Sequence, residues 1–182
     1  LSFLKKILII FKINLLVITL FTSSAQATTS FVDSFNVSSQ ENLPTDVTFN
    51  NDGTKMFVIG FSGDDVNEYT LSTGFDVSTA SFVDSFSVAA QENAPTGIAF
   101  NDDGTKMFVT GTSGDDVNEY TLSTGFDVST ASFVDSFSVS SQEGLPSDVT
   151  FNNDGTKMFV VGLVGDDVNE YTLSTGFDVS TA

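Results

Sequence analysis

The strongest constraint on the fold is an internal repeat with a period of 51 residues. The segment 31–35 (Phe-Val-Asp-Ser-Phe) recurs at 82–86 and again at 133–137. The first two copies differ at only 10 of 51 positions. A period of this length is typical of solenoids, propellers and other arrays, in which each unit buries its apolar side against a neighbour.

Each repeat is predicted to form four short strands, because apolar residues alternate and no segment of it has a helical period. In the first full unit the Asn-Asp-Gly at 51–53 is a strong hairpin signal, since its turn requires positive φ. A second turn is expected at 63–65, and 72–74 breaks the third strand. The expected strands are residues 46–50, 55–60, 66–71 and 81–88.

Four antiparallel strands in about 50 residues form the blade of a β-propeller. We therefore expect an all-β fold of three four-stranded antiparallel units, with the phenylalanines packing blade on blade. Two alternatives remain at this point: a β-solenoid, and an exposed aromatic platform for sugars.

Three blades are fewer than the four to eight that close a propeller. The chain is thus expected to be a partial ring or half of a six-bladed dimer. In the dimer the N-terminal strand, 30–37, would complete the partner's third blade. Self-association through exposed blade faces and a fragment of a longer chain are the two explanations that the sequence allows.

Residues 95–109 (Pro-Thr-Gly-Ile-Ala-Phe-Asn-Asp-Asp-Gly-Thr-Lys-Met-Phe-Val) and 116–122 (Asp-Val-Asn-Glu-Tyr-Thr-Leu) resemble the YVTN-type repeat of secreted and cell-surface β-propellers. That group is similar in turn to lactonase-like seven-bladed propellers. The resemblance implies a propeller fold. It carries no active-site motif, and this chain departs from it by a longer connection between the third and fourth strands and by having only three units.

The first 27 residues differ in kind from the rest. Lys5, Lys6 and Lys12 precede an apolar run at 13–21, and the segment ends in Ser-Ser-Ala-Gln-Ala. This pattern predicts a secretory signal peptide cut after Ala27, with the repeat domain at 28–182. The alternative is a retained N-terminal anchor. The expected location is secreted, periplasmic or at the cell surface.

The composition excludes several classes of function. There is no His, Cys or Trp, so a Ser-His-Asp triad, a thiol nucleophile and a structural zinc site are ruled out. The net charge of −18 argues against binding nucleic acid or an anionic membrane, because both require clustered cations.

Differences between the repeats concentrate at one end of the blades. Strand direction alternates, so the loops between the second and third strands (B–C loops) and between successive blades (D–A loops) share that end. We predict a ligand-binding face there, against the alternative of neutral drift in loops. Its candidate residues are Phe61, Ser62, Thr112, Ser113, Leu163, Val164, Leu43, Ala94 and Leu145.

Paired aspartates at the same end could bind calcium, which takes six to eight oxygen ligands. Glu41, Glu92 and Glu143 are expected nearby at the same end of the blades. A solvated acidic rim that stabilises turns is the alternative, and no other cofactor is expected. The candidate ligands are Asp64, Asp65, Asp115, Asp116, Asp166 and Asp167.

The sequence thus predicts a secreted, non-enzymatic propeller module for binding or adhesion, with an unknown protein or glycan ligand. A lactonase-like hydrolase and a structural segment of a longer array are the alternatives. Near-identical blades repeat one environment, whereas a catalytic carboxylate pair needs two unlike ones. A pocket near the ring axis lined by unlike polar residues would favour the enzyme.

Overall fold

The structure, a computed structural model, describes residues 29–182. The predicted signal peptide, residues 1–27, lies outside the described residues. Residues 33–182 form one compact unit, and the following description concerns that unit. No helix in this part of the chain combines the length and hydropathy that crossing a bilayer requires.

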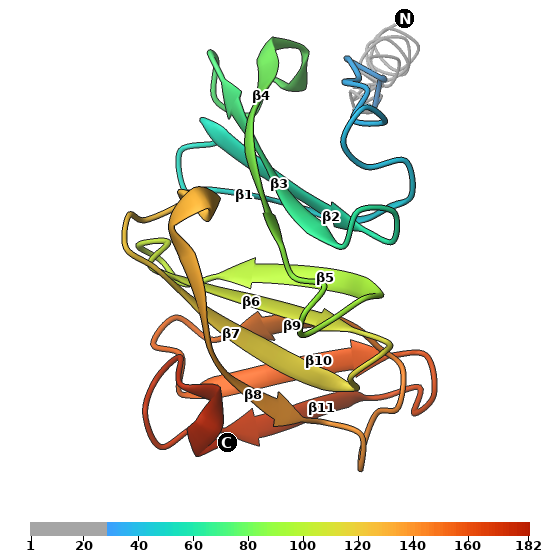
Figure 1. Ribbon diagram of the computed structural model, residues 1–182, viewed down its shortest axis with the longest axis vertical. Coiled ribbons are helices and arrows are strands. Elements are labelled where there is room, and N and C mark those ends of the chain that lie inside the picture. Colours follow the sequence, from blue (N-terminus) through green and yellow to red (C-terminus); the bar gives the residue numbers. More distant parts are fainter. Residues whose placement is uncertain (1–28) are drawn as a thin grey trace, which may run out of the picture. The chain divides into compact units, whose positions relative to one another are not determined.

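Eleven strands and three short 3₁₀ turns follow one another in a regular order (Figure 1). The first sheet has the order β1-β2-β3-β4, the second β5-β6-β7-β8 and the third β11-β10-β9, and neighbouring strands are antiparallel. The strands are β1 (Pro44–Phe49), β2 (Lys55–Gly60), β3 (Asp65–Leu71), β4 (Ala80–Ser87), β5 (Pro95–Phe100), β6 (Lys106–Gly111), β7 (Asp116–Leu122), β8 (Ala131–Ser138), β9 (Pro146–Phe151), β10 (Lys157–Gly162) and β11 (Val168–Thr172). The 3₁₀ turns are η1 (Val77–Thr79), η2 (Val128–Thr130) and η3 (Val179–Thr181).

The Asn-Asp-Gly turn forms the hairpin between β1 and β2, as the sequence predicts. Gly53 has φ of +71°, which a residue without Cβ adopts at no steric cost. The Asp52 side chain accepts the Thr54 amide at 3.0 Å, and Asn50 Oδ1 accepts the Lys55 amide at 2.9 Å. Local hydrogen bonds therefore set the register of this hairpin.

Two details of the strands differ from the prediction. The innermost strands begin earlier, at Pro44, Pro95 and Pro146, because a proline at the first position of an edge strand forfeits no ladder hydrogen bond. The connection expected to be a plain break, 72–80, contains the turn η1. Asp76 caps this turn by accepting the Ser78 amide at 3.1 Å.

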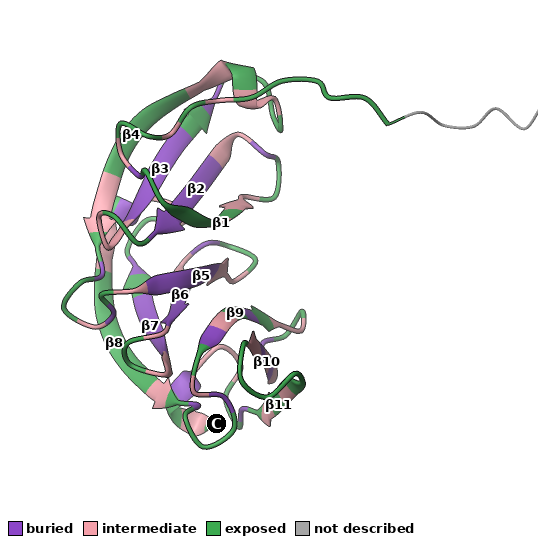
Figure 2. Cartoon of the chain, turned by 90° about the vertical axis from the view of Figure 1, so that its right-hand side faces the viewer, coloured by how far each residue is buried: buried purple, intermediate pink, exposed green. Residues whose placement is uncertain are grey.

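The three sheets stack face to face in chain order, with β1, β5 and β9 side by side along one margin (Figure 2). The core lies between the sheets. Phe57 and Ile59 of the first sheet are fully buried against Ile98 and Met107 of the second. This arrangement is a series of propeller blades and excludes the solenoid alternative, because each unit is a separate antiparallel sheet.

The third blade differs from the other two within the described residues. It has three strands, and β11 has no neighbour on its outer side. Residues 30–37, whose sequence matches β4 and β8, are in no strand. The prediction of four strands per unit is therefore met in two of the three sheets.

Candidate functional site

The two kinds of loop predicted to form the binding face come together in every blade. The Phe61 amide donates to the Leu43 carbonyl at 3.1 Å. The same 3.1 Å contact joins Thr112 to Ala94 in the second blade and Leu163 to Leu145 in the third. The structure thus places the predicted residues in three separate groups, one per blade.

A buried glutamate holds each of these loop pairs in place. Glu41 is fully buried, and its carboxylate accepts the amides of Leu43 at 2.6 Å, Ser62 at 3.2 Å and Gly63 at 3.4 Å. Glu92 and Glu143 repeat this role. The pKa of Glu143 is lowered, chiefly by the hydrogen bond from the Leu145 amide. These glutamates are structural parts of the loops and are not exposed rim ligands.

The tips of the B–C loops expose apolar side chains in the first and third blades. Phe61 is 45% exposed, Leu163 71% and Val164 60%. Ser62 and Ser113 instead donate hydrogen bonds to Asn42 and Asn93 in the adjacent D–A loops. The assignment of this face to ligand binding stays a prediction.

The paired aspartates have backbone roles at the same loops. Asp64, Asp115 and Asp166 each take φ between 51° and 54°, the left-handed conformation of a turn. Asp116 Oδ1 accepts the Asn118 amide group at 2.8 Å, and Asp167 Oδ1 accepts that of Asn169 at 3.0 Å. Within residues 29–182, no three acidic side chains are arranged to hold a metal ion. The calcium site also stays a prediction.

A different pair of carboxylates lies on the innermost strands. Asp46 of β1 and Asp148 of β9 occupy equivalent positions in the first and third blades, and the second blade has Gly97 of β5 there. A Cβ built on Gly97 would lie 2.8 Å from the Asp148 Cα and 2.9 Å from the Ser147 carbonyl oxygen. The absence of a side chain at Gly97 therefore lets β9 approach β5 closely.

The two carboxylates have unlike surroundings. Asp46 Oδ2 accepts the Ile98 amide of the second blade at 3.0 Å, and its Oδ1 accepts the Val47 amide at 2.7 Å. Asp148 accepts only the amide of Val149, at 2.8 Å. Partial loss of hydration raises the pKa of Asp148, and the negative charge of Asp46 raises it further.

An open cavity of about 300 Å³ joins these strands. We call it the inner-strand cavity; residues 46–48, 98–100 and 148–150 line it. It lies on the margin formed by the innermost strands, where a closed propeller has its central channel. One carboxylate is anchored by two amides, while the other is a stronger base than a free aspartate.

Sequence reasoning missed this pair as a site. The variation Asp46/Gly97/Asp148 is visible in the alignment of the repeats, but the sequence does not show that the three strands carrying it lie side by side. Contacts of β1 and β9 with β5 bring both aspartates to one cavity. The sequence feature that could have revealed the pair is the replacement of a charged residue by glycine in one repeat only.

Comparison with solved structures identifies the architecture. The periplasmic gluconolactonase of Pseudomonas aeruginosa superposes with a TM-score of 0.54 at 17% identity, over 76% of this chain and 36% of that one. The β-propeller domain of Cps50 (Swd1) from Myceliophteria thermophila superposes with a TM-score of 0.53 at 10% identity, over 72% and 40%. The chain has a β-propeller fold.

A third similar structure is a candidate 6-phosphogluconolactonase of Bacteroides fragilis, with a TM-score of 0.56, 16% identity, and coverage of 76% of this chain and 36% of that one. The chain thus spans little more than a third of the length of these propellers. No protein-family model matches the sequence, and no curated protein is significantly similar to it. Identities this low establish the fold alone.

Proposed function

We propose that this chain forms part of a propeller that hydrolyses a neutral sugar lactone in the inner-strand cavity. The observation that carries the proposal is the unlike carboxylate pair, Asp46 and Asp148, on the channel wall. The sequence alone favoured a non-enzymatic module, on the ground that near-identical blades repeat one environment. The surroundings of the two aspartates nevertheless differ, because the Ile98 amide of the following blade binds Asp46, whereas no blade follows Asp148 in the described residues.

The chemistry that fits is general-base hydrolysis. Asp148 would take a proton from a water molecule as the water attacks the lactone carbonyl. The ring C–O bond of the tetrahedral intermediate then breaks, and Asp148 returns the proton to the departing ring oxygen to give a hydroxy acid. Asp46, fixed by two amides, would accept hydrogen bonds from sugar hydroxyls. Two carboxylates and a net charge of −18 repel a phosphate, which favours a neutral lactone over a phosphorylated one. The gluconolactonase among the similar structures supports this class of substrate.

The test is the rate of acid release from glucono-δ-lactone, corrected for spontaneous opening in buffer. The expected effect of Asp148→Asn is a fall in kcat/KM of about 100-fold or more. The matched control is Asp154→Asn, which changes an exposed turn aspartate outside the cavity and should leave the rate unchanged. A wild-type rate equal to that of buffer would refute the proposal.

The exposed apolar loop tips favour a second candidate, the binding or adhesion module. Its test replaces Phe61 by Thr and the pair Leu163-Val164 by Thr-Ser, the residues of the second blade. Weaker retention on immobilised neutral polysaccharides would support binding through this face. Unchanged retention would contradict it.

A further inference from the structure

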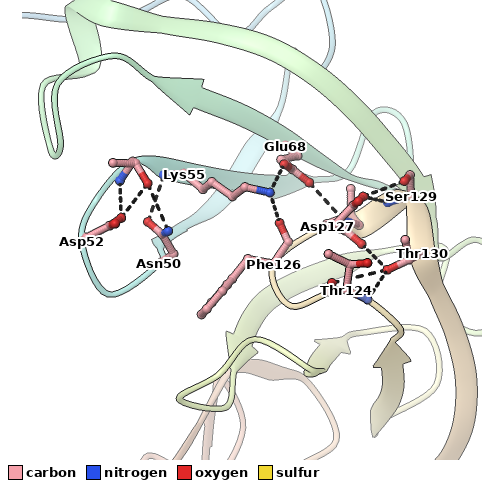
Figure 3. Close-up of polar contacts among 11 residues, drawn as sticks. Asn50, Asp52, Lys55, Glu68, Thr124, Phe126, Asp127, Ser129 and Thr130 are labelled. Atoms are coloured by element: carbon pink, nitrogen blue, oxygen red, sulfur yellow. Dashed lines mark hydrogen bonds and ion pairs between the residues drawn. The ribbon is translucent and has the colours of Figure 1, made fainter.

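The two junctions between blades use one repeated set of polar contacts. Lys55 Nζ donates to Glu68 at 2.7 Å and to the Phe126 carbonyl of the next blade at 2.5 Å (Figure 3). Glu68 Oε2 accepts the Val128 amide at 3.0 Å. Lys106 and Glu119 make the same contacts with Phe177 and Val179. Each Lys–Glu pair therefore holds the 3₁₀ turn of the following blade.

The third blade carries the same donor surface, and no other part of residues 29–182 covers it. Glu170 pairs with Lys157 but is 50% exposed, whereas its equivalents Glu68 and Glu119 are 2% exposed. Val168 is 64% exposed, although Val66 and Val117 at the same position are fully buried. This face has the side chains of an inter-blade junction and lacks the blade that covers them.

The first blade carries the complementary acceptor surface. An apolar pocket of about 360 Å³ opens on it, lined by Val47, Met56, Val58, Val77 and Phe35 among others. In the second blade the equivalents of Val47, Met56, Val58 and Val77 belong to one buried cluster with Phe57 of the first blade, and the Phe57 ring lies 4.5 Å from that of Phe100 and 6.2 Å from that of Phe126. Phe159 is the residue of the third blade that corresponds to Phe57, and it is only partly buried.

We propose that the third blade of one copy docks on the first blade of a second copy, closing a six-bladed ring with two-fold symmetry. Phe159 would pack beside the apolar pocket on Phe49 and Phe75 of the second copy, the equivalents of Phe100 and Phe126, and Lys157 and Glu170 would bind the Phe75 carbonyl and Val77 amide of that copy. Six blades lie within the range that closes a propeller, and a two-fold ring makes both junctions identical. This inference does not depend on the proposed function.

The fourth strand of the third blade would come from residues 29–36 of that second copy. Residues 29–37 match 80–88 at all but two positions. Phe35 already packs on Tyr69 of its own first blade, with ring centroids 5.6 Å apart at 76°, as Phe86 packs on Tyr120 at 5.6 Å and 78°. The register of β3 with β4 then predicts that Phe35 pairs with Val168 and Ser34 with Asn169.

The first experiment is sedimentation velocity of the purified protein between 1 and 100 µM. The expected result is a dimer. Val168→Lys should raise the dimer dissociation constant at least about 100-fold, because it places an unpaired charge in the junction. It should leave the folded monomer intact, since Val168 is exposed there. A protein that stays monomeric at 100 µM would overturn the proposal, and this is the result expected if further repeats or another protein complete the ring. Association that persists in Val168→Lys would also overturn it.

The second experiment uses the absence of cysteine from the chain. Ser34→Cys and Asn169→Cys are prepared separately and mixed under mild oxidation. A disulfide between the two variants is expected, and it can form only between different chains. The control is a mixture of Asn42→Cys with Asn169→Cys. These two positions do not lie opposite each other in the proposed strand pairing, so they should not cross-link. No cross-link in the first mixture, or equal cross-linking in both, would contradict the proposed strand pairing.

Discussion

At the scale of single residues, the departures from the repeat matter more than the repeat. Nearly identical side chains fill the junctions, with Ile98 in one where Val149 stands in the other, but the inner-strand cavity shows a larger difference between blades. Gly97 has no side chain, so β9 approaches β5 closely, and two carboxylates instead of three line the cavity. The glycine and the aspartates therefore make separate, testable contributions to stability.

Replacing Gly97 by Ala should destabilise the protein by about 1–3 kcal/mol, because the new Cβ would overlap backbone atoms of Ser147 and Asp148, which cannot rotate away. The matched control is Gly144→Ala, since a Cβ at Gly144 meets no atom within 4 Å. Urea denaturation measures both. Equal losses in the two variants would show that β5 and β9 are not in close contact.

Asp148→Asn should raise the melting temperature at pH 7 and leave it unchanged at pH 3. The pKa of Asp148 is raised in the folded protein, chiefly by loss of hydration. Its contribution to stability is therefore complete below the unfolded pKa and is lost as pH rises through the folded pKa. Asparagine keeps the oxygen that accepts the Val149 amide hydrogen. It cannot ionise, so the loss of stability with rising pH does not occur.

Asp154→Asn should show the opposite dependence on pH. Hydrogen bonds from Thr156, the side chain first, lower the pKa of Asp154. The stabilisation exists above the unfolded pKa and disappears as pH falls through the folded pKa. The melting temperature of the variant should thus be lower than that of the wild type at pH 7 and equal to it in strong acid. Parallel shifts of both variants at all pH values would refute the assigned pKa directions.

At the scale of the elements, much of the fold was predictable because the determinants are local. The second strand of the unit, 55–60, was predicted with the observed limits, since glycine turns lie on both sides of it. The start of β1 was not predicted, because proline usually argues against a strand. Whether a strand lies at the edge of its sheet, where proline is tolerated, depends on tertiary structure. The inner-strand cavity was missed for the same reason: it arises only when three innermost strands from separate repeats lie side by side.

The Lys–Glu pairs connect strands of one blade with the turn of the next, and their value depends on burial. Lys106→Met should cost about 3–5 kcal/mol in the free energy of unfolding, because it leaves the buried Glu119 carboxylate without its cation. Adding Glu119→Gln should recover most of the loss, since a neutral amide still accepts the Val179 amide hydrogen. Thermal and urea denaturation would measure both, and a double variant no better than the single one would contradict this account.

At the scale of the whole molecule, charge opposes compactness. The repeat domain contains all 24 acidic side chains of the chain and only Lys55, Lys106 and Lys157 as cations, so like charges repel across the surface. The apolar junctions between sheets must overcome this repulsion. The balance between the two should respond to ionic strength.

Raising NaCl from about 10 to 150 mM shortens the screening length from about 30 to 8 Å and should raise the melting temperature. KCl at the same concentration should give the same shift. CaCl₂ at equal ionic strength separates screening from binding: an extra increase would support calcium ligation at the paired aspartates, and none would count against it. A melting temperature that does not respond to salt would contradict the role assigned to charge repulsion.

The repeated Lys–Glu contact with the next 3₁₀ turn has a consequence for how such a protein can change over time. Since both junctions use the same lysine and glutamate contacts, insertion or loss of one whole unit by recombination within the gene leaves these polar contacts matched. Ring size can therefore alter in steps of one unit while the Lys–Glu contacts between neighbours are preserved.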